Sequence, residues 1–77
     1  RMAQHDESLA SFQKAIDLDP NYYPALNGVG VCMLNKWLVS GRTDTAAREA
    51  GITALRRSVQ VKRDQPEVID LLTRYGR

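Results

Sequence analysis

Few of the side chains that build catalytic and metal-binding sites occur in this 77-residue chain, which has one cysteine and one histidine. Because Cys32 is alone, the sequence excludes an internal disulfide framework and a cysteine-rich zinc site. His5 is followed by Asp6 and Glu7, but three consecutive residues of a helix point in different directions, so they give no ligand spacing. The pair Gly28 and Gly30 follows no strand and is no dinucleotide signature. The sequence therefore predicts no enzyme, no cofactor, no metal site and no small-molecule substrate.

Long apolar runs and a strong net charge are missing as well. No run approaches the roughly 20 residues of a membrane span, and no signal peptide is visible. Eleven Lys and Arg against nine Asp and Glu give a net charge of +2, which is too small to demand a nucleic acid or a membrane as partner. The lack of a disulfide and of a signal favours a cytoplasmic location.

The composition is that of an ordinary globular protein. Hydrophobic residues make up 43% of the chain and charged residues 26%, which argues against disorder. The length suffices for one small domain over residues 1–77. Since Arg1-Met2 is not a natural start, we expect this domain to be a piece of a longer protein or to carry residues added at its start.

Apolar residues recur at helical spacing between three breaks, at Asp19-Pro20-Asn21, Ser40-Gly41 and Asp64-Gln65-Pro66-Glu67. The longest stripe steps by three or four residues along one helical face. It consists of Tyr22, Leu26, Val29, Met33 and Trp37. No segment alternates with a period of two over a useful length. We therefore predict an all-α fold of four helices, with antiparallel neighbours, over residues 3–18, 22–39, 44–63 and 66–75.

Particular residues mark the starts of the helices and the close contacts between them. We expect Asn21 to cap the second helix, Thr43 or Asp44 to cap the third, and Asp64 with Glu67 to form a capping box on the fourth. A glycine inside a helix costs about 1 kcal/mol relative to alanine. The helical glycines therefore predict close approach of a neighbouring helix, and they are Gly28, Gly30 and Gly51.

One junction carries a repeat pattern. The second helix and closing turn of a tetratricopeptide repeat resemble the run Ser8-x-x-x-Phe12-x-x-Ala15-Ile16-x-Leu18-Asp19-Pro20-Asn21-Tyr22. The first helix of the next repeat resembles the run Pro24-Ala25-Leu26-x-x-Val29-Gly30-x-x-Met33. The family's usual aromatic, leucine and tyrosine are replaced here by other large apolar groups. The resemblance implies stacked helical hairpins, in which each pair leaves an apolar face for the next helix to cover.

The second half departs from this pattern. Gly51-x-x-x-Leu55-x-x-Ser58 is in register with the run that begins at Ser8, but it follows 43 residues later rather than the roughly 34 of the family. The chain therefore resembles about one and a half repeats with a nine-residue expansion, followed by a helix that would cap the array. One and a half repeats is fewer than the roughly three such arrays need. We expect the open end to be covered by the rest of a longer chain or by a second copy, as in a homodimer.

Arrays of this family bind peptide segments in a groove lined by the first helix of each repeat. The groove positions of this chain would be Pro24, Asn27, Val31, Leu34 and Asn35. Some members clamp a terminal carboxylate, but only Asn27 matches that set, and carboxylate binding is not carried over. The sequence thus predicts a protein–protein interaction or scaffold module that contacts a protein or peptide partner through Asn27, Val31, Leu34 and Asn35, or that self-associates.

Two other readings stay open. The helices would form a structural accessory domain if they only dock on an adjoining domain and bind no groove ligand. The basic residues at the end of the third helix either compensate the helix dipole in solvent or bind an acidic partner, and they are Arg56, Arg57, Lys62 and Arg63. Trp37, near the end of its helix, is a candidate for a half-exposed contact surface.

Overall fold

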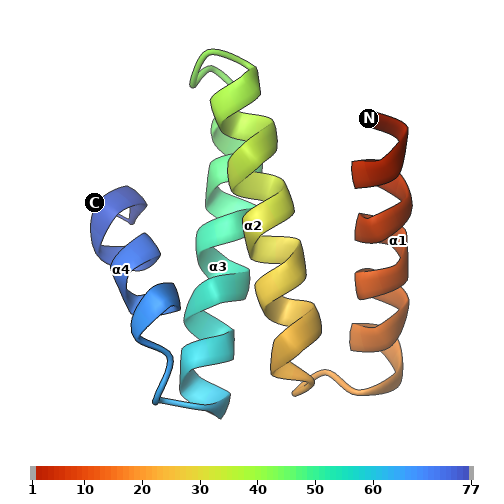
Figure 1. Ribbon diagram of the computed structural model, residues 1–77, viewed down its shortest axis with the longest axis vertical. Coiled ribbons are helices and arrows are strands. Elements are labelled where there is room, and N and C mark those ends of the chain that lie inside the picture. Colours follow the sequence, from red (N-terminus) through yellow and green to blue (C-terminus); the bar gives the residue numbers. More distant parts are fainter. Residues whose placement is uncertain (1, 77) are drawn as a thin grey trace.

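The computed structural model describes the backbone of residues 2–76 and the side chains of residues 9–76. This part of the chain is all-α, with helices α1 (Met2–Leu18), α2 (Tyr23–Val39), α3 (Thr45–Val61) and α4 (Pro66–Tyr75). Consecutive helices run antiparallel (Figure 1). The predicted fold class is confirmed, and the helix ends lie within two residues of their predicted positions.

The helices are held together chiefly by the pair α2 and α3, which make the most extensive contact. Helix α1 packs on α2, and α4 packs on α3, at opposite edges of the molecule (Figure 1). The largest cluster of buried apolar residues joins α2, α3 and α4, and consists of Leu34, Ile52, Leu55 and Val68. Among the described residues, no helix is long and apolar enough to cross a lipid bilayer.

Glycines allow the close contact between α2 and α3, as the sequence predicts. A Cβ atom added to Gly51 would lie only 2.9 Å from the carbonyl oxygen of Gly30, a separation that real Cβ atoms do not adopt. A Cβ on Gly28 would meet the ring of Phe12 in α1. The gain in packing at these contacts offsets the poor helix propensity of glycine.

The turn before α2 differs from its prediction. Asn21 does not cap the helix, because the N-cap position falls one residue later, at Tyr22. The Asn21 backbone N–H donates to the Asp19 carboxylate at 3.1 Å, within the turn around Pro20. Helix α2 begins after Tyr22, without a side-chain cap. Pro24 lies in the first turn and has no N–H group, so it lowers the number of donors that a cap would have to satisfy.

Helix α3 begins with a side-chain cap, and helix α4 begins without one. Asp44 caps α3 as predicted, accepting a hydrogen bond from the Ala47 backbone N–H at 3.1 Å. The predicted capping box of Asp64 and Glu67 is wrong, because α4 begins one residue later, after Gln65, which makes no side-chain bond to the helix. The Gln65 side chain is buried and bonds to α2 and α3 instead.

Candidate functional site

The four predicted contact residues divide into two pairs. Leu34 is only 4% exposed and belongs to the core, and the amide of Asn27 is used in internal hydrogen bonds. Both are therefore corrected to structural residues. Val31 is 44% exposed and Asn35 is exposed. A partner contact through Val31 and Asn35 stays a prediction.

The bonds of Asn27 belong to a closed ring of three side chains, which we call the polar cluster: Asn27 of α2, Ser58 of α3 and Gln65 before α4. The Asn27 amide donates to Gln65 Oε1 at 2.7 Å, and the Gln65 amide donates to Ser58 Oγ at 3.0 Å. The Ser58 hydroxyl donates to Asn27 Oδ1 and closes the ring. The Gln65 amide also donates to the Ser58 and Lys62 carbonyl oxygens at the end of α3. Each side chain thus finds a donor and an acceptor within the ring, and the cluster fixes the start of α4 against α2 and α3.

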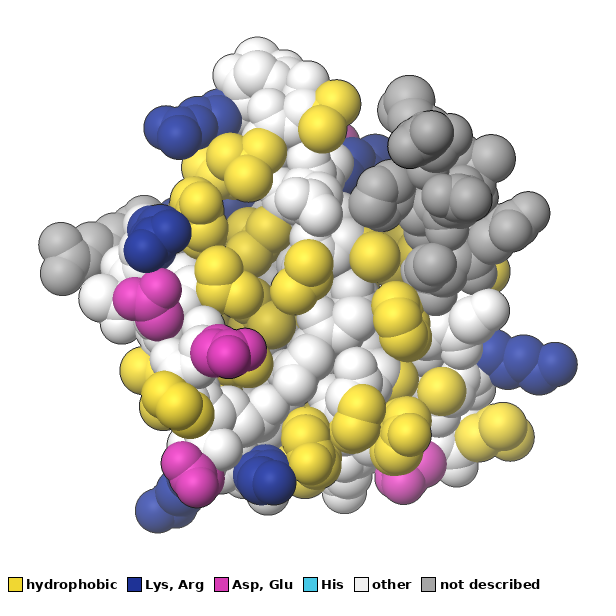
Figure 2. Space-filling model, viewed as in Figure 1, with side chains coloured by type: hydrophobic (Ala, Val, Ile, Leu, Met, Phe, Trp, Pro, Cys, Tyr) yellow, Lys and Arg dark blue, Asp and Glu magenta, His cyan; other side chains and the backbone are white. Residues whose placement is uncertain are grey.

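Because Asn27 bonds to Gln65 at the start of α4, its position shows which side of α2 faces α4. Residues four positions apart lie above one another on a helix, so Val31 and Asn35 continue the strip that begins at Asn27. At the far end of α2, the ring of Trp37 meets that of Tyr75 edge-on, with centroids 5.9 Å apart. We call this side of the molecule, where α2 and α4 meet at both ends, the α2–α4 face. Figure 2 shows hydrophobic side chains gathered between the two helices, Lys and Arg side chains at the upper and lower ends, and Asp and Glu side chains beside them on the left.

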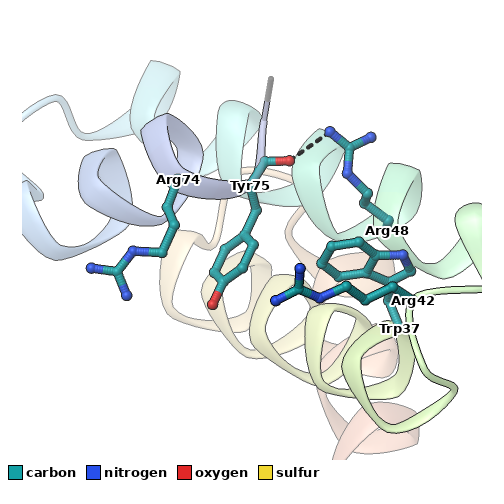
Figure 3. A pocket seen from close by; sticks show the side chains of 5 residues that line it. All are labelled: Trp37, Arg42, Arg48, Arg74 and Tyr75. Atoms are coloured by element: carbon teal, nitrogen blue, oxygen red, sulfur yellow. Dashed lines mark hydrogen bonds between the residues drawn. The ribbon is translucent and has the colours of Figure 1, made fainter.

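At this upper end lies a hollow of about 480 Å³, which we call the basic hollow (Figure 3). Four segments contribute to it: the end of α2, the loop to α3, the first turn of α3 and the last turn of α4. Its lining residues are Trp37, Arg42, Arg48, Arg74 and Tyr75. Three arginines and two aromatic residues thus line one concave place, and none of the five is acidic. Figure 3 shows that the Arg74 side chain points away from the other two arginines.

The loop before α3 positions Arg42 in the basic hollow. The Ser40 hydroxyl donates to the Trp37 carbonyl at 2.6 Å and accepts from the backbone N–H groups of residues 43–44. Gly41 and Arg42 have φ angles of 72° and 64°. The left-handed region costs a non-glycine residue roughly 1–2 kcal/mol. The bonds of Ser40 therefore hold Arg42 in a conformation that it would not adopt alone.

The cations of the basic hollow are packed against Trp37. The guanidinium carbons of Arg42 and Arg48 lie 5.6 and 5.8 Å from the centre of the indole ring, within the range of cation–π attraction. Arg48 also donates to the carbonyl oxygen of Tyr75 at 2.6 Å, which ties α3 to the end of α4 (Figure 3). Two of the three guanidinium groups are thus fixed in place by groups of the protein.

The hollow contains one buried donor and one exposed ion pair. The buried Nε1–H of Trp37 has no acceptor among the described residues. Arg74 pairs with Asp70 at 3.3 Å, but the two side chains are 62% and 64% exposed, so this ion pair is weak. The place can therefore accept a group that supplies a hydrogen-bond acceptor.

Sequence reasoning identified Trp37 as a contact candidate and missed the three arginines around it. Arg42 and Arg74 are 32 residues apart, and only the packing of α4 on α3 brings them to one hollow. The run of basic residues at the other end of α3, which the sequence singled out, is dispersed: Arg56, Arg57 and Arg63 are exposed, and Lys62 donates to the Tyr23 hydroxyl at 3.3 Å.

The other reactive groups give no second site. Burial raises the pKa of the Cys32 thiol above its usual value, because desolvation disfavours the thiolate. This agrees with the packing role that its place in α2 indicates. The side chains of His5, Asp6 and Glu7 lie outside the described ones. Among the residues that are described, no three His, Cys, Asp or Glu side chains group as metal ligands would.

Comparison of the chain with family models, curated proteins and solved structures gives no match.

Proposed function

We propose that the chain is a protein–protein interaction module, similar to a tetratricopeptide repeat, that binds a segment of a partner protein on its α2–α4 face. The observation that supports this most is the basic hollow. Tryptophan, tyrosine and arginine are the residues that dominate binding energy at protein interfaces. Here they are clustered in a concave place rather than scattered over the surface.

The surface beside the hollow suits a peptide. Val31 stands a turn and a half before Trp37 along α2 and leaves 44% of its surface exposed. Asn35, exposed one turn after Val31 on the same strip of α2, offers an amide that bonds to a peptide backbone. A segment that lies along this strip would therefore meet an apolar contact first and then a polar one.

A selection of peptides from a random displayed library, with the chain immobilised, tests this proposal. We expect enriched peptides whose binding weakens about tenfold or more in Val31→Asp, because a carboxylate would stand in the apolar contact. Leu18→Asp is the matched control, since Leu18 is 82% exposed at the end of α1, away from this face. Equal losses in both variants, or no enrichment at all, would contradict the proposal.

Self-association is a second candidate, favoured by the state of α1. None of the described side chains of α1 is buried, and its apolar face packs only in part against α2. In a helical array such a face is covered by a further helix. Light scattering over a hundredfold dilution, with Ile16→Glu as the disrupting variant, tests it. A dimer that becomes monomeric in Ile16→Glu supports this candidate, and a monomer at every concentration rejects it.

A further inference from the structure

We infer that α1 is an exchangeable helix: when two copies of the chain associate, α1 of each copy packs on α2 of the other. This inference rests on the self-association candidate above, and it names the surface and the helix through which the copies bind each other. Three observations support it: the contact between α1 and α2, the weak attachment of α1, and the composition of the turn that joins the two helices.

Helix α2 has a glycine on each of two sides, and each glycine receives a large side chain of a neighbouring helix. A Cβ atom added to Gly30 would lie 2.5 Å from Leu55 of α3, and one added to Gly28 would lie 2.5 Å from the ring of Phe12 of α1. Phe12 and Leu55 occupy the same position of the repeated pattern, 43 residues apart. The surface of α2 at Gly28, which we call the Gly28 socket, therefore binds an amphipathic helix that presents a large apolar side chain.

The neighbours of α2 are held unequally. Leu55 of α3 is 0% exposed, and α4 at the other edge is held by buried Val68 and by the bond from Arg48 to the Tyr75 carbonyl. Phe12 is only half-buried, and none of the described side chains of α1 forms a hydrogen bond or ion pair with another helix. The contact of α1 with α2 is also less extensive than that of α3 with α2. Since few buried contacts favour local opening, α1 is the helix that separates from α2 most easily.

The turn between α1 and α2 suits an exchange. It spans only residues 19–22, where the Asp19 carboxylate accepts from the Asn21 N–H at 3.1 Å and the Asp19 carbonyl accepts from the Tyr22 N–H at 3.0 Å. These residues are exposed, so water replaces the two bonds when the turn opens. Asp19 precedes Pro20, and a residue before proline favours an extended backbone. The opened turn can therefore extend and carry α1 to a second copy.

A second copy is the occupant that the structure favours for the Gly28 socket. Its α1 fits the socket with the contact that α1 already makes within one chain, so the dimer needs no new interface. A helix of another protein would leave the displaced α1 without a partner, whereas exchange between two copies fills both sockets and packs both α1 helices. The closed and exchanged forms then differ mainly in the turn and in the lost independent motion of the copies, so protein concentration decides between them.

Phe12 is the only phenylalanine of the chain, so its ring protons identify the contact by nuclear magnetic resonance. Equal amounts of isotopically labelled and unlabelled chain are unfolded together in urea and refolded at high concentration, so that the two kinds of copy mix. We expect a nuclear Overhauser contact between the Phe12 ring of an unlabelled copy and Gly28 of a labelled copy. If each α1 stays on its own α2, this contact occurs only within one copy.

Two variants that each break the contact complement each other only if α1 is exchanged. Phe12→Ala removes the inserted side chain, and Gly28→Leu fills the socket. A mixed dimer restores one intact pair, and we expect it to form at least about tenfold more tightly than the dimer of either variant alone. The control mixture combines Gly28→Leu with the double variant Phe12→Ala and Gly28→Leu, which offers no open socket, and it should show no such preference. Circular dichroism confirms that the variants are folded.

The outcomes separate this inference from the candidate on which it rests. A dimer in which the contact between Phe12 and Gly28 stays within one copy would overturn the inference and leave self-association standing. A monomer at every concentration would overturn both. Equal association in the complementing and the control mixtures would also overturn the exchange of α1. Binding of library peptides to the α2–α4 face tests the first proposal independently of these results.

Discussion

The polar cluster and the basic hollow lie at opposite ends of the α2–α4 face, and each joins α2, α3 and α4. In the polar cluster, every side chain both donates to and accepts from another member of the ring. In the basic hollow, the lining residues are basic or aromatic, and the buried indole N–H of Trp37 has no acceptor among the described residues. Polar side chains that supply hydrogen-bond donors and acceptors to one another stabilise a fold. A buried donor without an acceptor can bind a group that supplies one. The difference supports a structural role for the first end, and for the second it supports the recognition role that we propose.

Removal of the amide from the polar cluster should have the largest effect on stability. Asn27→Ala leaves the O–H of Ser58, a residue that is 0% exposed, without an acceptor and Oε1 of Gln65 without its donor, both in a buried place. We expect the free energy of unfolding in urea to fall by about 2–3 kcal/mol.

Asn35→Ala is the matched control, since it makes the same substitution in the same helix at an exposed position. It should change the free energy of unfolding by less than about 0.5 kcal/mol. If both variants lose the same free energy of unfolding, the ring does not hold the helices together, and the polar cluster does not differ from the basic hollow in its structural role.

Relief of the backbone strain at Arg42 should have the next largest effect on stability. In Arg42→Ala the left-handed φ of 64° still penalises a Cβ atom, whereas Arg42→Gly removes that penalty. Both variants lose the guanidinium equally, so their difference isolates the backbone. We expect the glycine variant to be more stable than the alanine variant by about 1 kcal/mol in chemical unfolding. Equal stabilities would show that the loop holds Arg42 without strain.

Removal of the two exposed cations of the hollow should have the smallest effect on folding. Arg42→Gln with Arg74→Gln breaks one exposed ion pair and one cation–π contact, and we expect the free energy of unfolding to change by less than about 1 kcal/mol. The thermal midpoint of the variant is the measurement. A loss as large as that of Asn27→Ala would mean that the hollow is structural like the other end.

The four helices could be predicted from the sequence because their signals are local. Proline and glycine mark the breaks, the apolar spacing marks the buried faces, and Asp44 lies where a cap must lie. The glycines of α2 and α3 also indicated close contact, because only packing offsets their cost in a helix. The wrong caps at Asn21 and Asp64 show the limit of such signals. In the first case the N-cap position falls on Tyr22. In the second it falls on Gln65, whose buried side chain bonds to α2 and α3 instead of to its own helix.

The candidate site could not be predicted, because it depends on distances between helices. Asn27 was assigned to a groove, but its place opposite Ser58 and Gln65 follows from how α4 returns along α3. The same return brings Arg74 and Tyr75 to the indole of Trp37. A pattern read along one helix gives the strip on which Asn27, Val31 and Asn35 lie. It does not tell which member of the strip meets another helix and which stays exposed.

A nuclear magnetic resonance titration of the isotopically labelled chain with a peptide selected from the displayed library tests the central claim most directly. The single tryptophan gives one indole N–H signal, and the side-chain amides of Asn27 and Gln65 report the polar cluster in the same spectrum. We predict that the indole signal and the backbone amides near Arg42 shift and saturate, while the amides of the polar cluster stay in place. Shifts confined to the polar cluster or to α1, with an unmoved indole signal, would contradict the account.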